Sequence, residues 1–169
     1  MSSPKLVHAN ELKHKDPHSI ESLALYGFAT EEAMLSLSLF PNLTELSIAN
    51  MVNRQDNFSR FISTLVNLEV LDCQTSCLND SSLSNLSHLI HLKKLNLSTT
   101  HIAGAGLRHL SSLENLEELD LSNTLVSDGS LKHLTGLIKL TKLNLRDTRV
   151  TSLGVDSLHQ SLSVTYDQN

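Results

Sequence analysis

One short phrase recurs along this 169-residue chain at a fixed interval. The stretches "LNLSTT" (Leu95–Thr100), "LDLSNT" (Leu119–Thr124) and "LNLRDT" (Leu143–Thr148) begin 24 residues apart. A period of this size is typical of chains built from stacked structural repeats. The chain contains 35 leucines, whereas aromatic residues make up 4% of it and tryptophan is absent. This composition favours many similar small core layers over one irregular core.

Six units align on their first apolar residue, with steps of 23, 25, 24, 24 and 24 residues. They start at Ile20, Leu43, Leu68, Leu92, Leu116 and Leu140. A shortened seventh phrase, "SLSVTYDQN" (161–169), places Val164 and Tyr166 at the fourth and sixth positions of a unit. We therefore predict one repeat domain over residues 20–169, closed by a capping strand over 161–169. Residues 1–19 are predicted to form an N-terminal capping segment.

Each unit changes its hydrophobic period halfway. The first half reads L-x-x-L-x-L, as in "LEELDL" and "LTKLNL", and its period of two predicts a short strand with alternate residues pointing inward. In the second half, spacings of three such as that between Leu131 and Leu134 predict a short helix with one buried face. Polar residues precede these helices, and we expect Asn79, Ser127 and Thr151 to cap them.

One strand and one short helix per unit, stacked in the same direction, would form a parallel sheet inside an arc of helices. The sheet curves because a strand is narrower than a helix. These residues resemble the leucine-rich-repeat superfamily, whose unit L-x-x-L-x-L-x-x-N/C-x-L folds as a right-handed α/β horseshoe solenoid. The unit tails "HIAGAGLRHL", "LVSDGSLKHL" and "RVTSLGVDSL" are similar to the subtype found in substrate-recognition subunits of ubiquitin ligases and in some bacterial proteins, including effectors.

The ninth position departs from the family pattern, which has asparagine there. It holds Phe28, Met51, Ser76, Thr100, Thr124, Thr148 and Asn169. A threonine hydroxyl can bond the backbone of the turn, so we expect a hydroxyl ladder to replace the amide ladder in the middle units. The first two units diverge most, as terminal capping repeats often do.

Charge and hydropathy limit the classes of partner and compartment. The formal net charge is -5, from 13 Lys and Arg against 18 Asp and Glu, and there is no basic run, which disfavours nucleic acid. No apolar stretch reaches the roughly 18 residues that membrane insertion requires. The start "MSSPKLVHANELKHKDPHS" lacks the apolar run of a signal peptide. We expect an intracellular, cytoplasmic protein, delivered into a host cell if its source is a pathogen.

The two cysteines, Cys73 and Cys77, are four residues apart and cannot form an extracellular disulfide framework. Cys73 falls at a buried strand position and Cys77 in the following turn, so we expect their side chains to diverge. A nucleophilic cysteine needs an adjacent base, and no histidine lies in this stretch. Core packing is the predicted role of Cys73.

Three rows of side chains are predicted to point away from the core, onto the concave face. The third-position row is Ser22, Glu45, Val70, Lys94, Glu118, Lys142 and Ser163. The fifth-position row is Ala24, Ser47, Asp72, Asn96, Asp120, Asn144 and Thr165. The seventh-position row is Tyr26, Ala49, Gln74, Ser98, Ser122, Arg146 and Asp167. Because these side chains do not serve the core, we expect their identity to be free for recognition. The candidate partner-binding residues are Tyr26, Glu45, Asp72, Gln74, Lys94, Asn96, Glu118, Asp120, Lys142, Asn144 and Arg146.

This polar, mixed-charge face allows two interpretations. In the first it is solvated, and Lys94, Glu118 and Lys142, one strand apart, form exposed ion pairs worth roughly 0–1 kcal/mol each. In the second it binds another protein, with Tyr26 and Arg146 of the residue types most common as anchors. We predict a monomeric, non-enzymatic protein-interaction module without cofactor or metal. The alternative is a recognition subunit or pathogen effector that acts on a ubiquitin-ligase or signalling assembly.

Three patterns suggest other chemistry, and each has a simpler explanation. Asp72 and Asp120 are expected two strands apart, at about 10 Å, which is near the upper edge of the carboxylate separations in inverting glycoside hydrolases. An open arc, however, offers no cleft that excludes water, and a catalytic pair needs one. His109 and His133 share a helical position but lack a third zinc ligand. The "GAG" at 104–106 precedes a helix, and its place in the repeat explains it better than a phosphate loop does.

Overall fold

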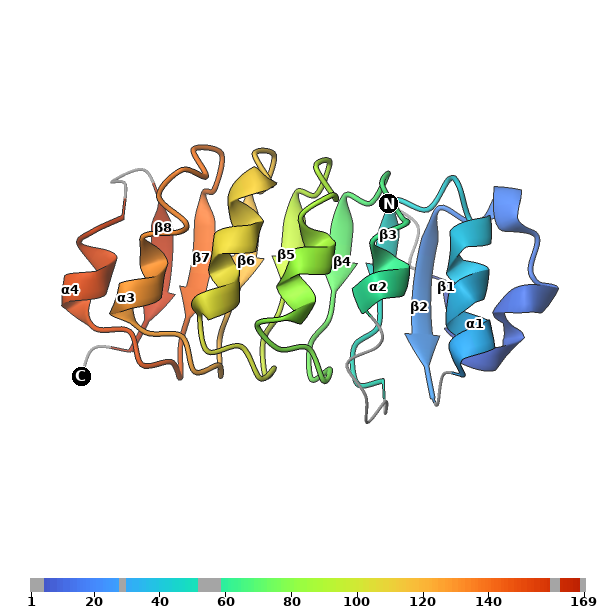
Figure 1. Ribbon diagram of the computed structural model, residues 1–169, viewed down its shortest axis with the longest axis horizontal. Coiled ribbons are helices and arrows are strands. Elements are labelled where there is room, and N and C mark those ends of the chain that lie inside the picture. The colour runs from blue at the N-terminus through green and yellow to red at the C-terminus, as the bar shows by residue number, and fades with distance from the viewer. Residues whose placement is uncertain (1–4, 28–29, 52–58, 159–161, 168–169) are drawn as a thin grey trace.

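The computed structural model describes residues 5–27, 30–51, 59–158 and 162–167. In these residues eight parallel strands form one sheet whose spatial order follows the chain from β1 to β8 (Figure 1). The strands are β1 Lys5–His8, β2 Ser22–Tyr26, β3 Glu45–Ser47, β4 Val70–Asp72, β5 Lys94–Asn96, β6 Glu118–Asp120, β7 Lys142–Leu145 and β8 Ser163–Tyr166. The predicted single parallel sheet is confirmed.

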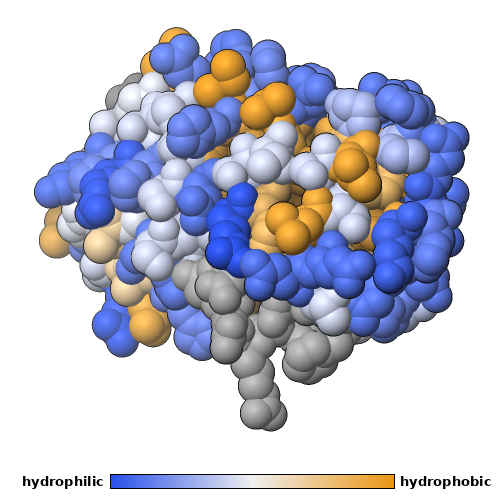
Figure 2. Space-filling model, turned by 45° about the vertical axis from the view of Figure 1, so that its right-hand side comes forward, coloured by the Kyte–Doolittle hydropathy of each residue, from blue (hydrophilic) through white to orange (hydrophobic). Residues whose placement is uncertain are grey.

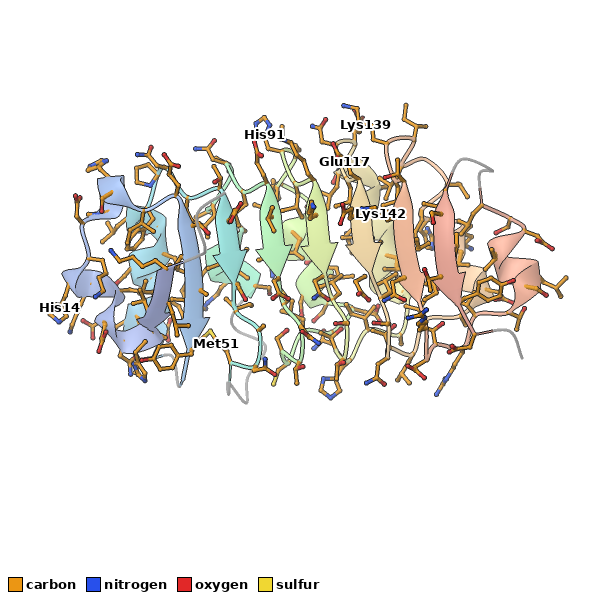
Figure 3. The ribbon with its side chains drawn as sticks, turned by 180° about the vertical axis from the view of Figure 1, so that it is seen from behind. His14, Met51, His91, Glu117, Lys139 and Lys142 are labelled. Atoms are coloured by element: carbon orange, nitrogen blue, oxygen red, sulfur yellow. The ribbon has the colours of Figure 1, made fainter. Side chains whose placement is uncertain are left out.

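Short helices cover one face of this sheet and leave the other face open (Figures 1 and 3). The α-helices are α1 Glu31–Leu35, α2 Ser59–Ile62, α3 Asp128–Leu131 and α4 Ser152–Val155. The 3₁₀ helices are η1 Ala9–His14, η2 Pro17–Ser19, η3 Ser36–Leu39, η4 Ser82–Leu86 and η5 Ala105–Ser112. A 3₁₀ helix has three residues per turn, so spacings of three keep Leu107 and Leu110 on its buried face. No helix in the described ranges is long and apolar enough to cross a membrane.

The strand register confirms the alignment of the units. Leu46 pairs with Leu71, and Leu95 pairs with Leu119, so equivalent positions stand side by side across the sheet. The third- and fifth-position residues pair in the predicted rows from β2 to β8. The seventh-position residues also stay in one row beyond the strand ends. Each eighth-position N–H from Asn50 to Asn123 donates to the seventh-position carbonyl of the next unit, which keeps neighbouring turns in the same register.

One continuous hydrophobic core runs along the solenoid between the sheet and the helices. Its repeated layer is the first, fourth and sixth strand positions, such as Leu92, Leu95 and Leu97, which are 0–2% exposed. Each fully buried leucine contributes roughly 1.5–3 kcal/mol. Cys73 takes a leucine's place in one layer and is fully buried, whereas Cys77 is half-buried, and both thiols are free, as predicted. Burial, followed by the charge of Asp72, raises the pKa of the Cys73 thiol well above its usual range.

The turn that follows each strand contains a residue in the left-handed backbone region. The eighth positions are Gly27, Asn50, Thr75, Thr99, Asn123 and Asp147, with φ of 85°, 59°, 57°, 55°, 54° and 53°. Glycine, asparagine and aspartate adopt this region readily, whereas a β-branched threonine is strained there. Thr99 is held in place by its N–H, which donates to the Ser122 carbonyl at 2.9 Å.

The predicted hydroxyl ladder at the ninth position is confirmed in the middle units. The Oγ1 atoms of Thr100, Thr124 and Thr148 each donate to the carbonyl three residues earlier, at 2.6 Å in all three cases. Ser76, in the same position one unit earlier, is buried, and its Oγ has no hydrogen-bond partner in the part of the chain that is described. Phe28 and Asn169 lie outside the described residues.

An asparagine ladder does exist, at the opposite end of the strands. The side-chain amides of Asn42, Asn67 and Asn115 each donate to a backbone carbonyl of the preceding unit, at 3.1, 2.9 and 2.8 Å. Lys139 takes the equivalent position in the next unit and donates to Asn115 Oδ1 at 2.7 Å (Figure 3). The amide therefore ties successive units together just before each strand, not just after it.

Two of the three predicted helix caps are wrong. Asn79 Oδ1 accepts from Ser81 N at 2.9 Å, as expected, but neither Ser127 nor Thr151 accepts a capping hydrogen bond with its side chain. At α4 the acceptor comes from the preceding unit, where the Asp128 carboxylate accepts from the Thr151 N–H at 2.8 Å and from its hydroxyl at 2.7 Å. At α4 the acceptor is therefore supplied by the neighbouring unit, whereas Thr30 caps α1 from within its own unit by accepting from the Ala33 N–H at 3.2 Å.

The two ends differ from the regular units. Residues 5–8, within the predicted N-terminal capping segment, form the additional strand β1, which pairs with β2 and was not predicted as a strand. At the other end β8 begins at Ser163, and its residues Val164 and Tyr166 pack partly buried against the core. Residues 161 and 168–169 of the predicted capping strand lie outside the described residues.

Candidate functional site: the concave face

A depression of about 510 Å³ lies on the open face of the sheet, over β4 to β8. We call this open face, opposite the helices, the concave face; Figure 3 views it directly, with Lys142 labelled. Eight of the candidate residues line the depression: Asp72, Lys94, Asn96, Glu118, Asp120, Lys142, Asn144 and Arg146. Three candidates do not line it: Tyr26, Glu45 and Gln74. The structure thus brings together most of the predicted residues, but not all of them.

The third-position row is tied together by a shared carboxylate. Glu118 Oε1 lies 3.1 Å from Lys94 Nζ and 3.0 Å from Lys142 Nζ, so the predicted ion pairs are formed. The hydrogen bond from Lys142 lowers the pKa of Glu118 below its usual range, partial burial opposes this shift, and Lys94 reinforces it. Because all three side chains are partly exposed, these pairs contribute little to stability.

The fifth-position side chains bond the backbone at the ends of the strands. This corrects the expectation that the residue types in this row are free for recognition. Side-chain oxygens of Asp72, Asn96, Asp120 and Asn144 each accept from the backbone N–H two residues further on, at 3.1, 3.0, 2.8 and 3.3 Å. Asp and Asn often make such local bonds in turns. The signal was present in the sequence, because every fifth position from Ser47 to Thr165 holds Ser, Asp, Asn or Thr.

The two aspartates considered for hydrolysis are also bonded sideways. Asp72 Oδ2 accepts from Ser47 Oγ at 3.0 Å, and Asp120 Oδ2 accepts from Asn144 Nδ2 at 3.0 Å. Together with the bonds to the strand ends, every oxygen of both carboxylates has a donor. The carboxylates therefore connect neighbouring strands, on a face that is open to water.

The seventh-position row is used least by the protein itself. Tyr26, Gln74 and Arg146 are exposed, and their side-chain polar groups have no hydrogen-bond or ion-pair partner among the described residues. Between Gln74 and Arg146 the side chains of the row are small and protrude little from the sheet, since Ser98 is 5% exposed and Ser122 is half-buried. The exposed Gln74 and Arg146 thus flank two serines that protrude little from the sheet.

The unpredicted strand β1 adds an apolar end to the concave face. Leu6 pairs with Ala24 and is 69% exposed, so it extends the fifth-position row with a leucine that faces solvent. Beside it, Tyr26 is 48% exposed, and its ring meets that of His8 edge-on with centroids 5.3 Å apart. Sequence reasoning missed Leu6 because the alternation in "KLVH" spans four residues.

The remaining patterns do not assemble a chemical site. The N–H groups of Ala103, Gly104 and Gly106 all donate to the Asp80 carboxylate, at 3.1, 3.0 and 2.7 Å, so an anion of the protein already occupies the "GAG" turn. His109 and His133 are half-buried on the helix side. Within the described parts of the chain, no three His, Cys, Asp or Glu side chains cluster closely enough to hold a metal ion.

The repeated strand, turn and helix of each unit define a leucine-rich-repeat solenoid. No protein-family model matches the sequence, and no curated protein matches it. Among solved structures the chain is similar to an internalin C2 from Listeria monocytogenes, with a TM-score of 0.70 and 20% identity over 89% of this chain and 62% of that one. It is also similar to an internalin (inlF) from the same organism, with a TM-score of 0.55 and 19% identity over 89% of this chain and 49% of that one. The chain spans less than two thirds of either internalin chain.

Proposed function

We propose that this chain is a protein-interaction module that binds another protein on its concave face and catalyses no reaction. The observation that carries the proposal is the depression over β4 to β8, whose lining includes eight charged and amide side chains outside the hydrophobic core. A solenoid presents such a surface over many strands, which suits an extended protein partner. The sideways bonds of Asp72 and Asp120 on an open face give the carboxylates a role other than hydrolysis.

The test compares concave and helix-side variants in one affinity purification with quantitative mass spectrometry, from the native cell. Reversing Glu118 to Lys and Lys142 to Glu keeps the net charge and should lower the yield of a concave-face partner at least tenfold, because like charges then face its complementary groups. Lys132→Glu, an exposed position beyond the end of α3, is the control and should leave the yield unchanged. Loss of the partner in the control variant, with full retention in the concave variant, would contradict the proposal.

A recognition subunit or effector needs a second binding surface outside the arc. The similarity of the unit tails to that repeat subtype favours this finer role, and Figure 2 shows apolar side chains gathered over the N-terminal helices. On these helices Leu35 and Leu39 are 56% and 57% exposed. If the chain has this role, a Leu35→Asp and Leu39→Asp variant should keep the concave-face partner and lose a second one in the same purification. An intracellular location belongs to the same proposal and is supported by the two free cysteines, which fit a reducing compartment; we propose that the chain acts there as a monomer.

A further inference from the structure

We infer that the partner presents an extended segment along the seventh-position row, with one carboxylate at Arg146 and an apolar side chain against Tyr26 and Leu6. This inference rests on the proposed function, because it names the chemistry of the concave-face partner. It moves the centre of recognition from the third- and fifth-position rows to the edge of the concave face where the strands end.

The first step is that the neighbouring rows are occupied by bonds within the sheet. Glu118 already holds both lysines of the third-position row. In the fifth-position row Asp72 and Asp120 each accept from the strand end and from a neighbouring strand. A partner would have to break these bonds before it could form its own hydrogen bonds to the same groups. The free energy lost with each broken bond would cancel much of the binding free energy gained from its replacement.

The second step is that Arg146 is a cation without a counter-ion among the described residues. It lines the depression, is exposed, and has no carboxylate within 4 Å in the described ranges. Asp167, its neighbour in the row, instead accepts the backbone N–H of Asp147. An arginine fork binds a carboxylate through two parallel hydrogen bonds, so an Asp or Glu side chain of the partner matches this position.

The third step is that the opposite end of the row presents apolar side chains. Leu6 and Tyr26 stand exposed there, with the small residues Ala24 and Ala49 half-buried beside them. Tyrosine is among the most frequent interface anchors. At β3 and β4 Glu45 and Asp72 disfavour an acidic group, which sets the orientation of the segment: its carboxylate lies toward β7 and its apolar residue toward β2.

The fourth step is the distance between the two anchors. β2 and β7 are five strand positions apart in the sheet order, which is about 24 Å at the usual strand spacing. An extended chain covers that distance with about seven residues. Small side chains follow β5 and β6, where Ser98 is 5% exposed and Ser122 is half-buried, so the backbone of the segment can approach the ends of these two strands; Gln74 stands exposed between them and Tyr26.

The test is a selection of displayed random peptides of about 12 residues, long enough to span about 24 Å, on the immobilised full chain. The enriched peptides should carry an Asp or Glu about seven residues from a large apolar residue. A fluorescein-labelled enriched peptide should bind Arg146→Glu and Tyr26→Ala at least tenfold more weakly than the unmodified chain. Arg149→Glu is the matched control at an exposed arginine three residues further on and should bind normally.

A charge exchange makes the test specific, since the same peptide with its acidic residue replaced by Lys should regain binding to Arg146→Glu. Peptides that lose affinity for the Glu118→Lys, Lys142→Glu variant, but bind Arg146→Glu normally, would overturn this inference and leave the proposed function standing. Failure to enrich any peptide, or peptides affected by none of these variants, would count against both.

Discussion

The middle of the solenoid and its first two strands use the same face of the sheet in different ways. From β5 to β7 the concave side chains bond one another: Glu118 joins two lysines, and Asp120 accepts from Asn144. In β1 and β2, Leu6 and Tyr26 stand 69% and 48% exposed. In the regular units many concave side chains are thus bonded to neighbouring strands, whereas at the irregular N-terminal end apolar side chains are exposed and available to a partner.

The largest expected effect contrasts buried and exposed leucines of these two regions. Leu119 is 2% exposed in β6, so Leu119→Ala should lower the free energy of unfolding by about 2–5 kcal/mol through lost burial and a cavity. Leu6→Ala in β1 should change it by less than about 0.5 kcal/mol, because the side chain faces solvent. Urea unfolding of both variants measures the difference. Equal losses would show that Leu6 belongs to the core.

The two cysteines test the inward and outward positions of one unit. Cys73→Ser should cost about 1–3 kcal/mol, since it buries a hydroxyl without an assured partner. Cys77→Ser, in the turn, should be nearly neutral. Thermal unfolding separates these outcomes, and thiol titration of the native chain should find Cys77 reacting well before Cys73. Equal reactivity of the two thiols would contradict the burial of Cys73.

The left-handed turn positions offer a stabilising change within the regular region. Thr99→Asn replaces a β-branched residue at φ 55° and should raise the free energy of unfolding by about 0.5–1 kcal/mol. The reverse change one unit later, Asn123→Thr at φ 54°, should lower it by a similar amount. If both substitutions shift the urea midpoint in the same direction, the left-handed backbone conformation is not what sets the stability difference between Asn and Thr at these positions.

The shared carboxylate of the third-position row predicts a small dependence on pH. The folded-state pKa of Glu118 is lowered, so its contribution is present above the pKa of the unfolded chain and is lost as the pH falls through the folded value. Glu118→Gln should therefore lower stability slightly at neutral pH, by well under about 1 kcal/mol, and the gap should close in acid. Glu114→Gln removes the charge of an exposed glutamate without an ion pair among the described residues, and serves as the matched control at neutral pH.

The sequence predicted well what each unit determines by itself. The alternation in "LEELDL" predicts that Leu116, Leu119 and Leu121 point inward, and all three are buried. The prediction succeeded because the same pattern occurs in every unit and depends on no contact with another unit. The spacing of three in the second half likewise predicted the buried helical face. The free Cys73 in the core followed from the same register.

The sequence predicted poorly what depends on two units. The acceptor at α4 is Asp128 of the preceding unit rather than Thr151, and the asparagine ladder bonds each unit to the one before it. The fifth-position row was interpreted as a recognition surface because its side chains leave the core, and the run of Ser, Asp, Asn and Thr along it was not taken as the sign of bonds to the strand ends. β1 was missed because four residues are too few to establish a period.

The central claim is that the fifth-position row holds the sheet together while the seventh-position row is available to a partner. The most direct measurement is the urea unfolding of Asp120→Ala beside that of Arg146→Ala. Asp120→Ala removes the acceptor of the Ser122 N–H and of Asn144 Nδ2, and should cost about 1–3 kcal/mol. Arg146→Ala should change stability by less than about 0.5 kcal/mol, because its side chain has no partner within the described residues. A neutral Asp120→Ala beside a destabilising Arg146→Ala would contradict the account.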